Sequence, residues 1–122
     1  MVGKILIVDD VAANRIVMKV KLTAAGYLPV LAHDGAACLS MARAERPDLV
    51  ILDLMLPGRS GLEIVESLRA DPATHGLPVL MLTAKGAGRE REAAERAGVS
   101  RFMTKPFSNA DILASVRALA GR

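Results

Sequence analysis

Four apolar runs in this 122-residue sequence end at side chains that could take part in phosphate chemistry. Those side chains are Asp9 and Asp10 after residues 5–8, Asp53 after 49–52, Thr83 after 79–82, and Lys105 after 101–104. Short apolar runs that alternate with helix-period stretches are typical of buried parallel strands linked by crossover helices. The ligand site of such a sheet lies outside the carboxyl ends of its strands. We therefore expect three carboxylates, one hydroxyl and one ammonium group at a single edge.

This set of groups indicates phosphoryl transfer assisted by a hard cation. Oxygen ligands without histidine or cysteine favour Mg²⁺, which needs only one or two carboxylates beside water and a phosphate oxygen. Asp53, alone after the expected central strand, is the candidate nucleophile toward phosphorus. Asp9 and Asp10 are the candidate pair of carboxylates that holds the metal ion. Thr83 and Lys105 would then donate a hydrogen bond and a positive charge to phosphoryl oxygens. Asp10 alone could instead cap the following helix.

Ten alternating segments are expected to position these residues. We expect strands at 4–8, 27–32, 49–52, 79–82 and 101–103, and helices at 12–25, 36–46, 62–70, 89–97 and 109–120. Gly26 and Gly98 stand where helices should end in a left-handed residue. Capping boxes are expected at Ser60 with Glu63 and at Ser108 with Asp111. The pattern predicts an α/β fold around a buried parallel sheet.

Composition narrows the class of protein. Hydrophobic residues make up 52% of the chain, yet it has only two Phe, one Tyr and no Trp, so we expect an aliphatic core. No apolar run approaches the ~18 residues of a membrane span, and no secretory segment opens the chain, which indicates a soluble, cytoplasmic protein. The single cysteine, Cys38, excludes an internal disulfide and is expected to be buried. The net charge of +3 is dispersed among acidic residues and does not indicate nucleic-acid binding.

Four segments of the sequence together resemble the receiver domains of bacterial two-component response regulators. They are ILIVDD, LVILDLMLPGRSG, PVLMLTA and FMTKPF, in that order across essentially the whole chain. The resemblance implies a flavodoxin-like, doubly wound (βα)5 fold with a five-stranded parallel sheet in the order 2-1-3-4-5. It also implies a single receiver domain over residues 1–122, with no output domain in this chain. Such a domain is a phosphoacceptor that assists its own phosphorylation and dephosphorylation, and not an enzyme with a separate substrate.

The resemblance assigns a role to each candidate residue of the metal site. Asp53 would accept a phosphoryl group from a histidine kinase or phosphotransfer protein. Asp10 and Asp53 would bind Mg²⁺ directly, together with the backbone carbonyl of Met55, while Asp9 would act through water. Asp53 is therefore expected to be both phosphoacceptor and metal ligand.

The resemblance also implies a switch and an output surface. Thr83 would move toward the phosphoryl group, Phe102 would turn inward behind it, and Lys105 would pair with the phosphoryl oxygens. The face of the fourth helix, fifth strand and fifth helix would then meet a downstream protein partner, with no direct contact to nucleic acid or membrane. The residues that make this face basic are Lys85, Arg89, Arg91, Arg96 and Arg101.

Receivers that dimerise through this face usually carry acidic residues where Val99, Ser100 and Arg101 stand. We therefore expect a monomer, or a weak dimer that depends on phosphorylation.

Three other functions share part of this chemistry. The chain could be a receiver fragment of a larger transcription factor or diguanylate cyclase, and its site would then be the same. A small aspartyl-phosphate phosphatase of the haloacid dehalogenase type needs a second aspartate two residues after the nucleophile, where Met55 stands. A flavodoxin-type FMN carrier needs a hydroxyl-rich phosphate loop after the first strand, and Asp9 and Asp10 would repel that phosphate.

Overall fold

The computed structural model describes residues 3–54, 56, 60–83, 88–104 and 108–120, with backbone only at 88–90. The strands are β1 (Lys4–Val8), β2 (Leu28–Ala32), β3 (Leu49–Asp53), β4 (Val79–Thr83) and β5 (Arg101–Thr104), and the helices are α1 (Ala12–Ala24), α2 (Gly35–Glu45), α3 (Gly61–Ala70), α4 (Gly88–Ala97) and α5 (Asn109–Ala120). The five strands form one parallel sheet in the order β2-β1-β3-β4-β5. The predicted fold class and strand order are confirmed.

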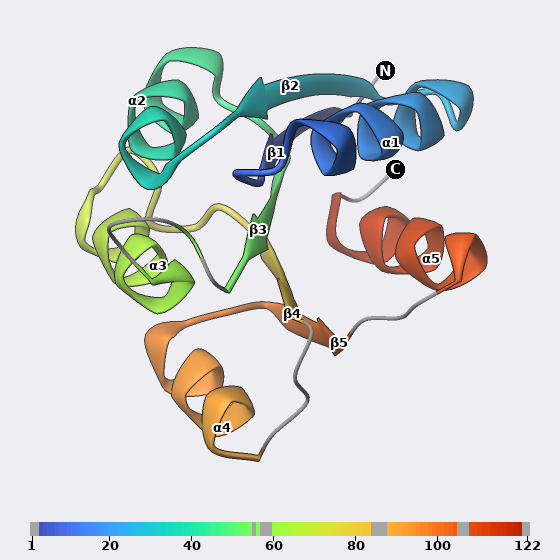
Figure 1. Cartoon of the computed structure of the whole chain (residues 1–122). Helices are drawn as coiled ribbons and strands as arrows, with labels where there is room; N and C mark the ends of the chain where they lie inside the picture. The colour runs from blue at the N-terminus through green and yellow to red at the C-terminus, as the bar shows by residue number, and fades with distance from the viewer. Residues whose placement is uncertain (1–2, 55, 57–59, 84–87, 105–107, 121–122) are drawn as a thin grey trace.

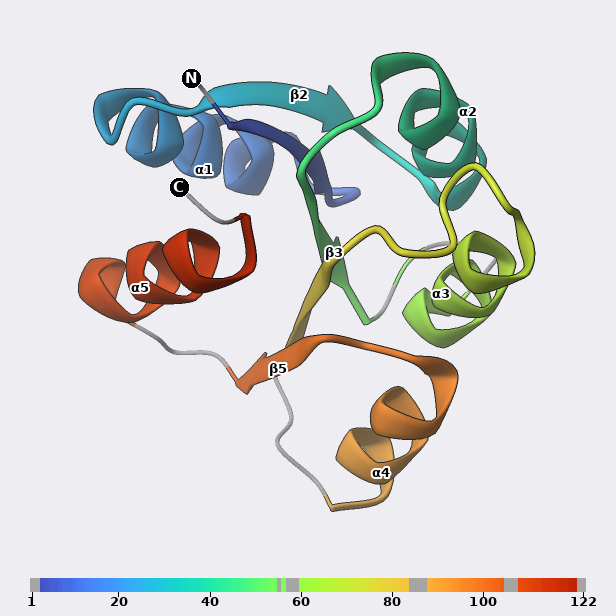
Figure 2. The same ribbon diagram turned by 180° about the vertical axis from the view of Figure 1, so that it is seen from behind.

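Helices cover both faces of the sheet, α1 and α5 on one side and α2, α3 and α4 on the other (Figure 1). Figure 2 shows the same layers from behind. The α1 and α5 side is closed by Met18, Leu22, Ile112 and Val116, and the opposite side by Cys38, Ile64, Leu68 and Ala94. Because both faces are covered, β1, β3 and β4 are apolar along nearly their whole length, as expected for parallel strands.

In-register pairing brings the ends of the three central strands to one edge. Val8 of β1 pairs with Leu52 of β3, and Leu52 pairs with Met81 of β4. Since the strands run parallel, Asp9 and Asp53 follow their paired neighbours at the same edge of the sheet. The strand alignment alone therefore places these two carboxylates close together.

The observed element boundaries lie within one residue of the predicted ones, and the shift of α2 has a local cause. The helix expected at 36–46 begins and ends one residue earlier. The Asp34 side chain accepts a hydrogen bond from the Ala37 amide and caps the first turn, while Arg46 leaves the helix with a φ of 48°. Asp53 and Thr83 are the last residues of their strands instead of the first residues after them.

The predicted helix signals are present. Ser60 and Glu63 form the capping box of α3. Gly26 and Gly98 have φ values of 93° and 103° and end α1 and α4 in the left-handed region. Cys38 is fully buried, and this burial raises the pKa of its thiol to about 12, so the residue is a protonated core side chain. None of the described helices is long and apolar enough to cross a membrane.

The guanidinium of Arg69 ties the end of α4 to the loop before β4. Its Nε and Nη2 donate to the Gly98 carbonyl at 3.1 and 2.8 Å, and its Nη1 donates to the carbonyls of Leu77 at 2.6 Å and His75 at 3.1 Å. A larger residue at Gly98 would be strained by the φ of 103°, and its Cβ would lie 3.0 Å from Arg69 Nε and 3.1 Å from Arg69 Cγ. Arg69 therefore supplies the donors for three carbonyl groups that belong to two different loops.

We expect Arg69→Met to lower the free energy of unfolding by about 1–3 kcal/mol, because it keeps the apolar stem and removes the donors to three carbonyl groups. Urea unfolding followed by circular dichroism measures the change. Arg43→Met is the matched control, since Arg43 makes an exposed ion pair with Asp71, and surface ion pairs of this kind contribute little to stability. Equal losses in the two variants would show that the carbonyl contacts of Arg69 add nothing.

Candidate functional site

The turn between β1 and α1 is held by hydrogen bonds to Asp9. The Asp9 amide donates to the Ala32 carbonyl at 3.2 Å and so continues the pairing of β1 with β2. The Oδ1 atom of Asp9 accepts from the Val11 amide at 2.9 Å. Nη1 of Arg15 donates to the Asp9 carbonyl at 2.6 Å. One carboxylate oxygen of Asp9 is thus engaged in the turn, while the backbone beside it is fixed from α1.

Asp10 is exposed at the same turn and does not cap α1. The N-cap position is Val11, and it makes no side-chain capping hydrogen bond. The helix-capping alternative for Asp10 is therefore wrong. Among the residues that the structure describes, no hydrogen bond or ion pair engages the Asp10 carboxylate, which leaves it available to a cation.

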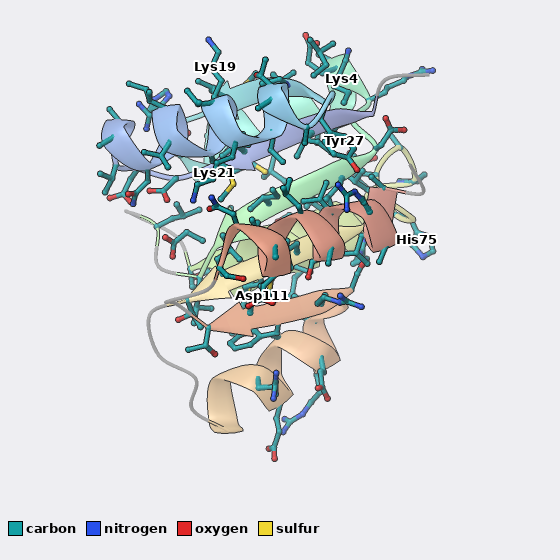
Figure 3. All side chains as sticks on the ribbon, turned by 90° about the vertical axis from the view of Figure 1, so that its right-hand side faces the viewer. Lys4, Lys19, Lys21, Tyr27, His75 and Asp111 are labelled. Atoms are coloured by element: carbon teal, nitrogen blue, oxygen red, sulfur yellow. The ribbon has the colours of Figure 1, made fainter. Side chains whose placement is uncertain are left out.

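Asp53 ends the central strand and lines a pocket together with Asp9. The pocket has a volume of about 360 Å³, and its apolar part includes Ile51 and Leu82 of the sheet. Val17, Met18 and Lys21 of α1 form its wall. Figure 3 shows Lys21 on the side of α1 that faces α5. Two carboxylates therefore lie at the rim of an apolar hollow whose wall carries one ammonium group.

Gly61 positions the chain behind Asp53, and its role was not anticipated from the sequence. A Cβ at this residue would lie 2.7 Å from the Asp53 carbonyl oxygen and 2.9 Å from Leu54 Cα, so only glycine lets α3 begin this close to β3. The Gly61 amide donates to the Leu54 carbonyl at 2.7 Å. The sequence signal was the glycine directly after the capping residue Ser60, at the end of the segment LVILDLMLPGRSG.

Thr83 and Phe102 lie near each other on the opposite face of the sheet. Thr83 is 2% exposed and pairs with Thr104, while Phe102 is 9% exposed and pairs with Met81. Because alternate residues of a strand share a face, Thr83 and Phe102 lie on the face that α4 covers. The guanidinium of Arg91 on α4 is 5.7 Å from the centroid of the Phe102 ring. Thr83, Phe102 and Arg91 therefore lie on one side of the sheet, between the end of β4 and α4.

The donor set fits Mg²⁺. Among the described residues no three acidic, histidine or cysteine side chains are grouped closely enough to hold a metal ion. Mg²⁺ does not require three, because it keeps several water ligands and binds through one or two carboxylates. Asp9 and Asp53 provide oxygen at one pocket, whereas Met55 and Lys105 lie outside the described residues. The individual roles of the site residues stay predictions.

A sequence profile of the response regulator receiver domain matches residues 5–117. The response regulator PleD of Caulobacter vibrioides is 39% identical over 119 residues, which are 98% of this chain and 26% of PleD. The response regulator MprA of Mycobacterium ulcerans is 41% identical over 119 residues, which are 98% of this chain and 50% of MprA. The chain thus spans a quarter to a half of the length of these relatives.

Solved structures with the same arrangement include the chemotaxis protein CheY4 of Vibrio cholerae, which matches with a TM-score of 0.92 and 28% identity over 98% of this chain and 99% of that one. The receiver domain of the sensor histidine kinase PA1611 from Pseudomonas aeruginosa PAO1 matches with a TM-score of 0.90 and 28% identity over 100% of both chains. That structure holds a magnesium ion in its active site cleft. Sequence match and strand order agree, and the chain belongs to the response regulator receiver domain family of two-component signalling.

Proposed function

We propose that this chain is a Mg²⁺-dependent phosphoryl acceptor that receives its phosphoryl group on Asp53 from a histidine kinase or phosphotransfer protein. The observation that carries the proposal is the position of Asp53, which ends the central strand of a receiver fold and shares a pocket with Asp9. In such a domain the phosphoryl group is a signal, so the chain turns over no separate substrate. We place this reaction in the cytoplasm.

The chemistry is a displacement at phosphorus. A carboxylate oxygen of Asp53 forms a bond to phosphorus while the bond to the donor's imidazole nitrogen breaks, and that nitrogen keeps the electron pair. Asp10, Asp53 and the carbonyl of Met55 would hold Mg²⁺, with Asp9 acting through water. The cation offsets the negative charge that gathers when a phosphoryl group approaches carboxylates. Lys105 would pair with the phosphoryl oxygens, and attack of water on the same phosphorus would restore Asp53.

Incubation with acetyl phosphate and Mg²⁺ should add one phosphoryl group to the wild-type protein, and intact-mass spectrometry measures the gain. Asp53→Asn should abolish the gain because the nucleophilic carboxylate is lost. Asp48→Asn is the control, since Asp48 precedes the same strand at the opposite edge and accepts a hydrogen bond from the Lys4 amide at 2.8 Å. A full mass gain in Asp53→Asn, or in excess chelator, would contradict the assignment.

The exposed face of α1 beside the pocket supports a protein as the phosphoryl donor. Ile16, Val17 and Val20 are 58%, 51% and 63% exposed, although they are large apolar residues in the middle of the helix. Val17 also lines the pocket that contains Asp53. Exposed apolar patches commonly mark protein interaction sites. We propose that the donor covers this face of α1 when it delivers the phosphoryl group.

Val20→Glu should slow phosphoryl transfer from a protein donor by about 10-fold, as expected when a charge enters an apolar contact. The same variant should react with acetyl phosphate at the wild-type rate. The donor is a histidine kinase selected from an autophosphorylated panel for transfer to the wild-type protein. Leu28→Glu is the matched control, because Leu28 is 52% exposed but lies at the far end of β2. This docking surface would be contradicted if Val20→Glu slowed transfer from the kinase and from acetyl phosphate equally. It would also be contradicted if Leu28→Glu slowed transfer from the kinase as much as Val20→Glu did.

The position of Thr83, Phe102 and Arg91 on one side of the sheet supports an output at the α4, β5 and α5 face. The described basic residues of this face include Arg91, Arg96 and Arg101, so complementary charge favours an acidic protein partner. We also propose a monomer or a weak, phosphorylation-dependent dimer, because Val99, Ser100 and Arg101 stand where receivers that dimerise through this face usually carry acidic residues. Because the relatives are longer, the partner is either a separate protein or an attached output domain, such as that of a transcription factor or diguanylate cyclase.

Thr83→Ala should still be phosphorylated on Asp53, but phosphorylation should change the structure of α4 and β5 less than in the wild type. The reason is that the Thr83 hydroxyl would move toward the phosphoryl group and let Phe102 turn inward behind it. Hydrogen exchange of residues 91–104, with and without beryllofluoride and Mg²⁺, measures that response. Thr74→Ala is the control, since Thr74 is equally buried and donates to the Leu68 carbonyl at 2.7 Å. A wild-type change in hydrogen exchange in Thr83→Ala would show that Thr83 does not couple phosphorylation to α4 and β5.

A further inference from the structure

Arg15 joins the second turn of α1 to the loop that carries the two acidic residues. Its Nη1 atom donates to the Asp9 carbonyl at 2.6 Å, and the bond is partly shielded from water. Its backbone amide donates to the Val11 carbonyl at 3.2 Å. The same residue therefore contacts the loop twice, once by its backbone and once by the tip of a long side chain.

The guanidinium bonds to a carbonyl although two carboxylates belong to the same turn. Within the part of the chain that the structure describes, no ion pair within 4.0 Å joins Arg15 to Asp9 or Asp10. A guanidinium forms its strongest hydrogen bonds with carboxylates, so contact with the carbonyl alone is informative. Arg15 fixes the backbone of the turn without neutralising either acidic side chain.

The start of α1 lacks a side-chain cap that would help to hold this turn in place. Val11 occupies the N-cap position and provides no side-chain cap, so a common means of fixing the entry to a helix is missing here. Among the described residues, the other hydrogen bonds of the turn run from the Val11 amide to Asp9 Oδ1 and from the Asp9 amide to the Ala32 carbonyl. Both of these involve Asp9, and the bond from the Val11 amide closes a side-chain turn around Asp10. Neither of them engages the Asp9 carbonyl, which Arg15 holds from α1.

We propose that Arg15 is a positioning residue for Mg²⁺ binding, which holds the peptide between Asp9 and Asp10 so that their carboxylates are presented at the pocket edge. The inference rests on the proposed function, because it assigns the cation to that phosphorylation site. Arg15 does not touch the cation. It restricts the turn from the carbonyl side and leaves the carboxylate charges available to the metal.

Removal of the Arg15 side chain should affect Mg²⁺ affinity in two opposite ways. Loss of a positive charge near the site should, by Coulomb's law alone, strengthen the binding of a divalent cation. Loss of the hydrogen bond to the Asp9 carbonyl should weaken Mg²⁺ binding, because mutation of residues that orient metal ligands typically lowers metal affinity by about 10–100-fold. The proposal requires the second effect to exceed the first.

The test is a titration of the metal-free protein with Mg²⁺ at low ionic strength, in which isothermal titration calorimetry gives the dissociation constant. We expect Arg15→Met to raise the dissociation constant by about 10-fold. Lys19→Met is the matched control, because it removes the same charge from an exposed position on the same helix and should leave Mg²⁺ affinity unchanged or slightly higher. Arg15→Lys should lie between wild type and Arg15→Met, since one ammonium replaces a planar group with several donors.

Several outcomes would overturn the inference. Unchanged or tighter Mg²⁺ binding by Arg15→Met would show that Arg15 acts only through its charge. A lower melting temperature of the metal-free variant with an unchanged dissociation constant would show a purely structural role. If Arg15→Met does not fold, wild-type Mg²⁺ affinity in Arg15→Lys overturns the inference and an intermediate affinity supports it. A wild-type protein that neither binds Mg²⁺ nor gains a phosphoryl group refutes the proposed function, whereas wild-type binding with an unaffected Arg15→Met refutes only the role of Arg15.

Discussion

The structure depends on the alignment of three buried parallel strands whose apolar parts end at the same level. β1, β3 and β4 are paired in register and covered by helices on both faces, so their polar residues are confined to the ends. A shift of one residue in this pairing would turn side chains from one face to the other and would bury a carboxylate. The apolar core therefore does more than stabilise the domain, because it fixes where Asp9 and Asp53 meet.

Two arginines show how a small domain uses guanidinium groups to fix loops. Arg69 donates to three carbonyl groups and joins the end of α4 to the loop before β4. Arg15 donates to a single carbonyl and restrains the turn that carries Asp9. In both cases the acceptors are backbone oxygens, so neighbouring carboxylates are left for other roles. Loops without regular secondary structure thereby gain fixed positions at both edges of the sheet.

The sequence was sufficient to predict the ten elements, the strand order and the edge at which the acidic residues lie. These features follow from apolar periodicity, from helix caps such as Ser60, and from the resemblance of four segments to one family. The contacts of Gly61 and Arg15 were not predictable in the same way. A missing Cβ matters only where another backbone approaches, and the partner of a long flexible side chain depends on the folded positions of all its neighbours.

The division of the helices between the two faces of the sheet separates two groups of side chains that can be altered independently. The α1 side carries the pocket with Asp53, whereas Phe102 and Arg91 meet on the side covered by α4. Substitutions on the exposed face of α1 leave the packing around Phe102 untouched, since the full thickness of the sheet separates them. The surface beside the pocket and the packing around Phe102 can therefore be altered one at a time, provided that the strands between them keep their register.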